Sequence, residues 1–540
     1  MLRRWQLIVC LFLPNLLAAA EPEPDIRQQP TGLRQTSAEM QSAVETIDSI
    51  LKASWDRDGI EPTSESSDAE FCRRVWLDLA GVAPPVATIR EFMVDARDDK
   101  RARLIDQLLR SPQYANHMAS RWNEILLPPD AQNQLQQQAN VTALHEWLRG
   151  QFRDNTPYDY FVGGFLTAGG AGDSGPAIFY TSHSLEPEKL AAATSRIFMG
   201  IQLQCAQCHD HPFDRWTQED FWHYAAFFSQ LEQGDTSGGR PAMIEDRVGG
   251  EVTLPDTDTV MVPRYPGVAE PPEEDPGDIR RRQLTIWMAS RDNPYFARAA
   301  VNRAWSHLFG RGIVDPVDAM DADNLPSHPE LLDFLTRYFI ELRFDLRKLY
   351  ATLARTRAYG LTSEIIGSER PDASQFAAMS VKTLSAEQFF DSLQQNVYRR
   401  SQPAVGNRSG DFMARQQFLS RMRSAGASPQ SYPHGVVQAL GMMNGPEMMS
   451  ATNPQQIGLL ASLEAPFFSD KDRVETLFLS TLSRLPTEDE LKTCLEMLSV
   501  GGSTEANRES NKDSISFQSQ QATADLLWVL LNTAECATCP

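Results

Sequence analysis

The sequence has 540 residues, of which 41% are hydrophobic, and a formal net charge of −21 at pH 7. A chain of this length predicts two to four domains with substantial hydrophobic cores. The negative charge argues against non-specific binding to nucleic acid and against attraction to an anionic membrane, because both repel an acidic protein. Composition therefore excludes two classes of partner and identifies none.

The first 20 residues have the pattern of a secretory signal peptide. Arg3 and Arg4 give a positive start, residues 5–17 form an apolar core, and residues 18–20 are three alanines that suit a cleavage site. The core contains Pro14 and is too short to span a membrane. No later stretch is long and apolar enough to do so. We therefore expect a mature protein that is exported, periplasmic or extracellular, and without an integral membrane segment.

Helical periodicity dominates the rest of the chain and predicts a mainly α fold. The pattern predicts two helical domains, which are joined by a short connector rich in proline, glycine and acidic residues. The predicted segments are a signal peptide over 1–20, a linker and one helix over 21–62, a helical domain over 63–230, a β- and coil-containing connector over 231–279, and a second helical domain over 280–540.

Local signals add detail to this map. Residues 100–109 and a segment from Pro112 predict consecutive helices, and residues 250–254 and 260–263 predict two short strands. Residues 501–520 are polar and rich in serine and asparagine, which predicts disorder before a last helix over 522–531. Three pairs predict helix N-termini closed by capping boxes: Thr217 with Asp220, Ser327 with Glu330, and Thr487 with Glu490.

Residues 205–214, CAQCHDHPFD, bring together the strongest candidate ligands in the chain. In an exported protein, Cys-x-x-Cys-His is typical of a c-type haem attachment site. Cys205 and Cys208 would add to the haem vinyl groups, and His209 would take one axial position on the iron. The flanking patterns predict a helix over 186–204 and another after Thr217, which would place the motif on a tight turn between two helices.

Other interpretations of the same motif remain open. Cys205 and Cys208 could form a small disulfide loop in an oxidising compartment. They could also bind zinc or iron together with His211 or His223. Because Cys208 and His209 are adjacent, their side chains diverge, and this argues against a simple site in which both bind one tetrahedral ion.

A further alternative uses nitrogen and oxygen ligands only. His209, Asp210, His211, Asp214 and His223 could hold a zinc or iron ion with an open coordination position, as in a metal-dependent hydrolase. For the haem interpretation, the candidates for a second axial ligand are His211, His223 and the methionines at 442, 443, 448 and 449.

Three other features are predicted to be structural. Cys72 is expected to be a core thiol and His117 a histidine satisfied within a helix. Cys536 and Cys539 form a terminal Cys-x-x-Cys that could close on itself or bind metal with another group. This pair lacks the following histidine, so it does not predict a second haem site.

Several motifs resemble a known family. The segment 71–84, FCRRVWLDLAGVAP, is similar to the opening of a planctomycete cytochrome domain, a domain of uncharacterised function found in large exported proteins. Residues 99–108, 111–114 and 205–228 fit the same family. Residues 293–298, 301–305, 309–312 and 326–333 resemble the second domain of unknown function that habitually follows it. The family name implies cytochrome c character through Cys205, Cys208 and His209, but supplies no reaction.

These observations favour an exported, cytochrome-like haem c protein that acts in electron transfer or as a redox partner in an extracytoplasmic pathway. The alternatives are a metal-dependent extracytoplasmic hydrolase, and a structural or cell-surface interaction protein in which the cysteines staple a loop. The partner would be a redox protein or a cell-surface protein of unknown identity, and no catalytic residue can be assigned from the sequence.

Overall fold

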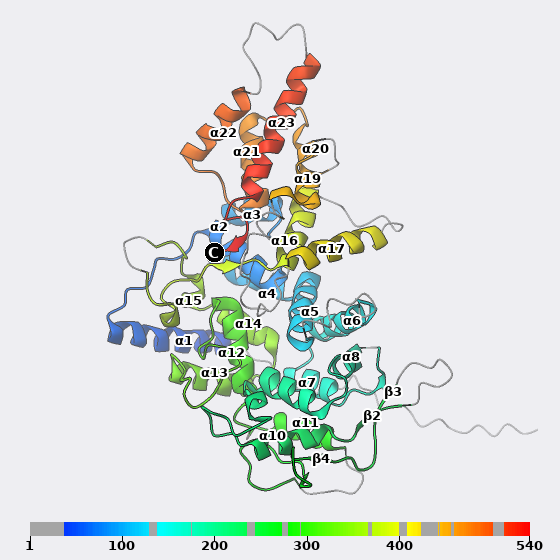
Figure 1. The fold of residues 1–540 in the computed structure, drawn as a ribbon. Helices are drawn as coiled ribbons and strands as arrows, with labels where there is room; N and C mark the ends of the chain where they lie inside the picture. The colour runs from blue at the N-terminus through cyan, green and yellow to red at the C-terminus, as the bar shows by residue number, and fades with distance from the viewer. Residues whose placement is uncertain are drawn as a thin grey trace, which may run out of the picture.

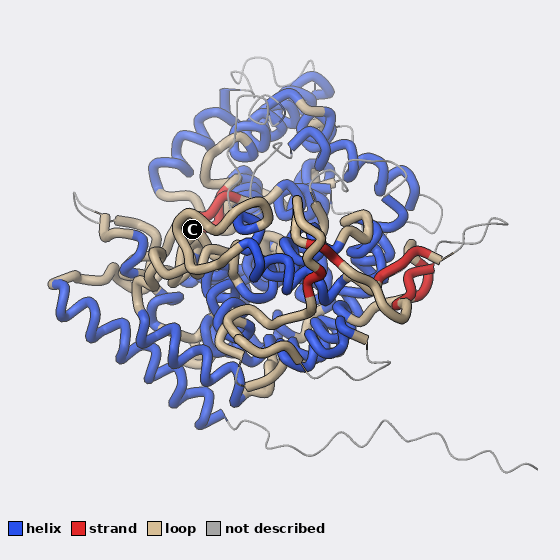
Figure 2. The backbone as a smooth tube through the Cα atoms, turned by 60° about the horizontal axis from the view of Figure 1, so that its bottom comes forward, coloured by secondary structure: helices blue, strands red, loops and turns tan. Residues whose placement is uncertain are grey.

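The computed structural model shows a mainly helical protein with a few very short strands (Figures 1 and 2). Among the described residues, no helix has both the length and the apolar character needed to cross a membrane. The predicted signal peptide lies outside the described residues. The structure describes residues 37–128, 138–173, 175–234, 243–272, 279–291, 293–365, 370–398, 408–422, 441, 443–454, 458–500 and 512–540.

The N-terminal half contains ten α-helices in the described residues, and their boundaries follow local sequence signals. Pro112 occupies the first turn of one helix, and the Ser111 hydroxyl accepts a hydrogen bond from the Tyr114 N–H at its N-terminus. The helices are α1 (Ser37–Asp58), α2 (Asp68–Val75), α3 (Val86–Val94), α4 (Lys100–Leu109), α5 (Pro112–Leu126), α6 (Gln138–Asp154), α7 (Tyr158–Leu166), α8 (Ile178–Ser182), α9 (Pro187–Thr194) and α10 (Gln218–Ala225).

The connector contains short antiparallel strands. Strand β3 (Met243–Asp246) lies between β1 (Gly170–Ala171) and β2 (Leu231–Gln233), with Gly170 opposite Ile244 and Leu231 opposite Asp246. A separate pair joins β4 (Val252–Thr253) to β5 (Val260–Met261), with Val252 opposite Met261. The two strands predicted over 250–254 and 260–263 are therefore confirmed, although each is shorter than predicted.

Helices return after the connector and continue to the C-terminus. The terminal strand β7 (Thr538–Cys539) pairs with β6 (Lys382–Thr383). The helices are α11 (Arg280–Met288), α12 (Phe296–Phe309), α13 (Pro329–Glu341), α14 (Leu346–Leu353), α15 (Arg357–Gly360), α16 (Ala386–Leu393), α17 (Arg408–Met422), α19 (Pro446–Ala451), α20 (Leu459–Leu463), α21 (Asp470–Thr481), α22 (Glu488–Val500) and α23 (Lys512–Leu531).

Buried apolar side chains form two clusters. The larger cluster extends from Ala43 to Met379 and also includes Leu479. The smaller cluster begins at Leu384, includes residues of α16, α17 and α19 to α23, and receives only Leu77 and Ala83 from the N-terminal half. The division between the cores thus lies near residue 380, whereas the composition change that predicts the connector lies at 231–279. In Figure 1 the helices that carry the second cluster lie in the upper part of the molecule.

Two consecutive buried arginines join these parts. Arg73 donates to the carbonyl oxygens of Glu535, Cys536 and Thr538 in the C-terminal segment, and to Thr481 O at the end of α21. Arg74 donates to Tyr359 O, Leu361 O and Pro540 O, at 2.6, 2.8 and 2.6 Å. The arginines of the segment 71–84 therefore have a structural role, since they satisfy carbonyl groups of distant segments.

Two local predictions are wrong for physical reasons. Ser327 does not cap α13, because its hydroxyl donates to Ile313 O and the N-cap position is taken by His328 without a side-chain cap. The disorder predicted over 501–520 fails in its second half, because α23 already begins at Lys512. Residues 501–511 lie outside the described residues. The other two capping boxes are present.

Candidate functional site

The Cys-x-x-Cys-His motif lies in a loop between α9 and α10. Helix α9 continues as a π-helical turn over Ser195–Met199 and ends at Gly200, whose φ of +69° is in the left-handed region. The helix predicted over 186–204 is therefore too long at its C-terminus. A Cβ at position 200 would also lie 3.1 Å from Met320 Sδ, so a glycine is needed there both for its conformation and for the close packing.

Helix α10 fixes the backbone of this loop. The Gln218 side-chain amide donates to Gln207 O and Cys208 O, at 3.2 and 3.0 Å, and the Trp222 indole donates to Gln207 O at 3.0 Å. The Gln218 N–H donates to Asp210 Oδ1 at 2.9 Å. The capping box of Thr217 and Asp220 starts α10 at the position where these contacts form. The predicted turn between two helical segments is therefore confirmed.

Both thiols of the motif are accessible. Cys205 lies in a 3₁₀-helical turn over Leu203–Ala206, and Cys208 lies two residues beyond its end. Both are exposed, and neither is in a disulfide. Cys72, Cys494, Cys536 and Cys539 are also free but buried. Accessibility therefore distinguishes the motif cysteines from the other cysteines that the structure describes.

The hydrogen bonds of His209 leave one ring nitrogen available as a ligand. Its Nδ1 lies 2.8 Å from the carbonyl oxygen of Asp210, so Nδ1 must carry the proton and donate it. In the neutral ring, Nε2 then keeps its lone pair. A metal-binding histidine commonly has this arrangement, in which a carbonyl group fixes the tautomer and makes the other nitrogen a better ligand.

The same reasoning shows that His223 and His211 differ in which ring nitrogen could bind a metal. His223, in the last turn of α10, has Nδ1 2.6 Å from Val262 O, so its Nε2 is also available as a ligand. His211 differs, because its Nδ1 accepts a hydrogen bond from the Phe213 N–H at 3.2 Å. The neutral ring of His211 therefore carries its proton on Nε2, which cannot bind a metal in that state.

The structure does not bring the alternative metal ligands together. Asp214 accepts a hydrogen bond from the Arg215 N–H at 2.7 Å. Across the described residues, no group of three or more histidine, cysteine or acidic side chains has a metal-binding arrangement. The site of His211, Asp214 and His223 therefore remains a prediction from sequence. It would require rearrangement of the loop and a change of the His211 tautomer.

The methionines considered as a second axial ligand are in another part of the molecule. Met448 is buried in the smaller core, in agreement with a packing role, and Met449 is 66% exposed. Figure 1 shows α19, which carries both residues, in the upper part of the molecule and α10 at the bottom. Met442 lies outside the described residues. Among the candidates that the structure describes, His223 has an available Nε2 and lies on α10, whose residues Gln218 and Trp222 contact the backbone of the motif.

The chemistry of this loop fits a covalently attached haem. Two accessible thiols separated by two residues meet the requirement for attachment, and the adjacent His209 has a ligand nitrogen. Phe213 in the same loop is 75% exposed and offers an apolar ring near these groups. The buried Cys536 and Cys539 do not meet the requirement. Burial raises the pKa of these thiols to about 11 and about 12, respectively, which keeps both protonated.

Two family models together match more than half of the chain. PSCyt2, described as a protein of unknown function (DUF1549), matches residues 46–233, and PSD1, described as a protein of unknown function (DUF1553), matches residues 280–409. The chain belongs to the family that carries these two domains in this order. The Cys-x-x-Cys-His loop and α10 lie within the PSCyt2 domain. No curated protein and no solved structure matches the chain.

A buried histidine pair links the PSCyt2 and PSD1 domains. His117 of α5 and His307 of α12 have ring centroids 5.7 Å apart, and each side chain is 7% exposed. Neither Nε2 atom has a hydrogen-bond partner within the described part of the chain. Burial, with a smaller contribution from the charge of Arg121, lowers the pKa of His117 to about 3. The pKa of His307 is also lowered well below its usual value, mainly by burial.

This pair predicts that the fold loses stability in acid. Above about pH 6.5 the His117 ring is neutral in both the folded and the unfolded state, so the stability of the fold is at its full value. As the pH falls towards about 3, the unfolded state binds a proton that the folded state does not, and stability is lost. For His117 the loss at pH 5 should be about 2 kcal/mol relative to pH 7. Denaturant unfolding at the two pH values should show a smaller loss for His117→Leu than for the wild type. Equal losses in the two proteins would contradict the assignment.

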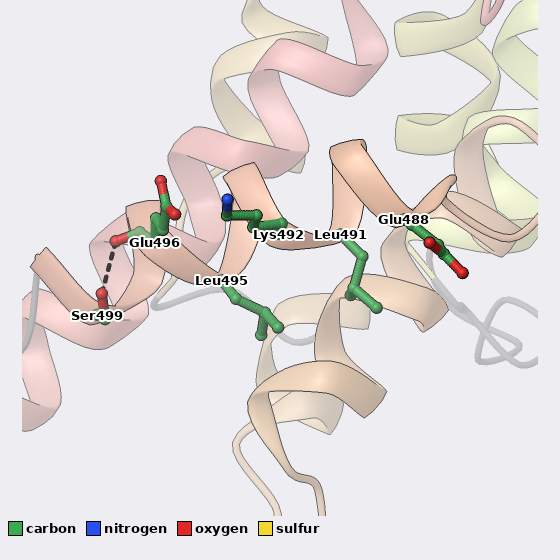
Figure 3. Close-up of a pocket in the computed structure, with 6 residues that line it drawn as sticks. All are labelled: Glu488, Leu491, Lys492, Leu495, Glu496 and Ser499. Carbon is green, nitrogen blue, oxygen red and sulfur yellow. Dashed lines mark hydrogen bonds between the residues drawn. The ribbon is translucent and has the colours of Figure 1, made fainter.

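The described part of the chain also has two hollows of several hundred Å³. One, of about 460 Å³, lies along α22 and is lined by a single helix face that includes Leu491, Lys492 and Leu495 (Figure 3). Its only hydrogen bond in that view is from Ser499 to Glu496 O within the same helix, so it brings no groups from different elements together. The other is a larger polar cleft between helices of both halves of the chain. Sequence reasoning missed it, because no local motif marks it.

Proposed function

We propose that the protein is an exported c-type haem protein that transfers electrons or serves as a redox partner in an extracytoplasmic pathway. The observation that carries the proposal is the combination of two free, exposed thiols with an adjacent imidazole whose Nδ1 proton is fixed by a backbone carbonyl. Haem bound in this way supplies reversible one-electron chemistry. Cys205 and Cys208 would hold it, and His209 would bind the iron through Nε2.

The surrounding residues explain how the loop would keep this arrangement. The hydrogen bond from His209 to Asp210 O increases the basicity of Nε2 and restricts rotation of the ring. Gln218 and Trp222 hold the backbone on either side of Cys208, so the two thiols keep their spacing. Asp210 has two roles here, since its carbonyl group orients His209 and its carboxylate accepts the Gln218 N–H.

Site variants test the proposal when the protein is produced in cells with c-type maturation machinery. Wild-type protein should show a haem-stained band on a denaturing gel and a c-type absorbance spectrum. The double variant Cys205→Ser/Cys208→Ser should show neither. Cys494→Ser, which changes a buried cysteine outside the motif, should retain both signals and serves as the control.

A second variant tests the role of His209 separately from attachment. His209→Ala should keep the covalent haem, because both thiols remain, but its Soret band should shift as the proximal ligand is lost or replaced. His211→Ala should leave the spectrum unchanged, since its Nδ1 is engaged with the Phe213 N–H. A spectrum that changes with His211→Ala and not with His209→Ala would refute this assignment of the ligand.

A further inference from the structure

A cleft of about 560 Å³ lies between four helices, away from the Cys-x-x-Cys-His loop. Helices α5 and α6 of the PSCyt2 domain line one side, and α16 and α17 line the other. Figure 1 shows α16 and α17 directly above α5 and α6, with α10 at the bottom of the molecule. The volume lies within the range of small-molecule sites, about 300–1,000 Å³.

The helices turn polar faces towards this space. On α5, Asn116, Ser120 and Glu124 follow one another at four-residue spacing, so they lie on one side of the helix. On α6, His145 lies on the facing side, with its Nε2 3.2 Å from Ser120 Oγ. Packed helices normally bury an apolar face between them. A polar face that is turned inward is unfavourable unless it has a partner.

Two polar atoms in the cleft wall have no partner in the structure. His117 and Asn123 are 7% and 8% exposed, and neither His117 Nε2 nor Asn123 Oδ1 has a hydrogen-bond partner among the described residues. Buried polar groups without a hydrogen bond are rare, because each costs about 1–3 kcal/mol. Because protein covers both atoms, a bound molecule would contact the more accessible polar groups of the same wall, which are Asn116, Ser120 and His145.

The charges of the cleft restrict the class of ligand. Arg415 donates to both carboxylate oxygens of Asp391 at 3.0 Å, and its pKa is also raised by the charges of Glu387 and Glu124. Arg149 also lines the cleft, so two guanidinium groups balance most of the charge of the three carboxylates of Glu124, Glu387 and Asp391. The lining therefore offers no strong excess of either charge to a cationic or an anionic ligand.

The histidines of the cleft also favour a neutral ligand. Burial lowers the pKa of His145, and that of His117 more strongly, so both rings are neutral near pH 7. A neutral imidazole donates through one nitrogen and accepts through the other, and the side-chain amide of Asn116 also does both. These groups match a hydroxyl group, which likewise donates and accepts. We propose that the cleft binds a neutral polyhydroxylated small molecule, of the size of a mono- or disaccharide.

Calorimetric titration of the full chain tests this proposal. The probes are a panel of neutral mono- and disaccharides, with oligogalacturonate and inorganic phosphate as anionic probes and spermidine as a cationic probe. At least one neutral saccharide should bind, and Asn116→Ala and Ser120→Ala should each weaken that binding at least ten-fold. Alanine is the best helix former, so both variants should keep α5 intact, which thermal melting can check.

The control is Arg153→Ala on α6, because that side chain is 66% exposed and does not line the cleft. It should bind the same saccharide with unchanged affinity. Binding of only the anionic or the cationic probes would overturn the proposal. So would saccharide binding that the Asn116 and Ser120 variants leave unchanged, or the absence of binding by any neutral saccharide of the panel. None of these outcomes bears on the haem, since no variant touches the Cys-x-x-Cys-His loop.

Discussion

Replacing Arg73 with methionine is expected to lower the free energy of unfolding by about 3–5 kcal/mol. The arginine is 2% exposed and donates hydrogen bonds to four backbone carbonyl groups and to Ser483 Oγ. Methionine fills similar space but leaves these acceptors buried without a donor, and each such group costs about 1–3 kcal/mol. Equilibrium unfolding in urea, followed by circular dichroism, measures the change.

Two further variants distinguish the effect of the lost hydrogen bonds on stability from the effect of removing a positive charge. Arg73→Lys keeps the charge but has fewer donors in a different geometry, so its stability should lie between those of the wild type and the methionine variant. Arg57→Met removes an arginine that is 70% exposed and should change stability by less than about 0.5 kcal/mol. If Arg73→Met were as mild as Arg57→Met, Arg73 would not join the two parts as described.

Replacing Asp78 with alanine should cost about 3–5 kcal/mol as well. Its carboxylate lies 2.5 Å from Lys382 Nζ and accepts a hydrogen bond from the Tyr359 hydroxyl at 2.9 Å. The Asp78 side chain is 4% exposed and that of Lys382 is 16% exposed, so little water can replace the lost partner. Urea unfolding of the variant measures the loss directly.

A double-mutant cycle shows whether the cost comes from the unpaired lysine. Adding Lys382→Met to Asp78→Ala should restore a large part of the lost stability, because it removes the uncompensated charge. The coupling energy between the two positions should exceed about 1.5 kcal/mol. Two effects that simply add would show that the ion pair contributes little and that the packing of Asp78 accounts for the loss.

The local structure was predicted well where neighbouring residues decide it. Helices α4 and α5 begin at the predicted residues, and the capping box of Thr217 with Asp220 forms because its two hydrogen bonds join residues three apart. Ser327 has the same sequence signal, but the distant carbonyl of Ile313 competes for its hydroxyl. A motif of this kind predicts a cap only when no tertiary partner is available.

Features that depend on distant segments could not be predicted. Arg73 and Arg74 have the composition of an exposed, charged helix face, and their burial depends on carbonyl groups more than 280 residues away. The polar cleft likewise requires α5 and α6 to face α16 and α17, and no residue pattern within one helix reveals this. The apolar core continues across the connector for the same reason, since composition marks a change of segment and not a change of packing.

The candidate site has some features that neighbouring residues determine and others that depend on distant segments. Cys205, Cys208 and His209 are adjacent in sequence, so the motif itself was sufficient to identify them. The tautomer of His209 depends on the next residue, Asp210, and is also a local feature. The tautomer of His223 depends on Val262, which is 39 residues away, and only the structure distinguishes it from that of His211.

The mass of the intact protein tests the haem assignment most directly. The protein should be exported by cells with c-type maturation machinery, purified, denatured and measured without proteolysis. Covalent attachment through Cys205 and Cys208 predicts a mass greater than that of the processed chain by one haem, which survives denaturation and is absent from the double serine variant. A wild-type mass without any haem addition, together with stoichiometric zinc or iron in the native protein or a Cys205–Cys208 disulfide, would contradict it.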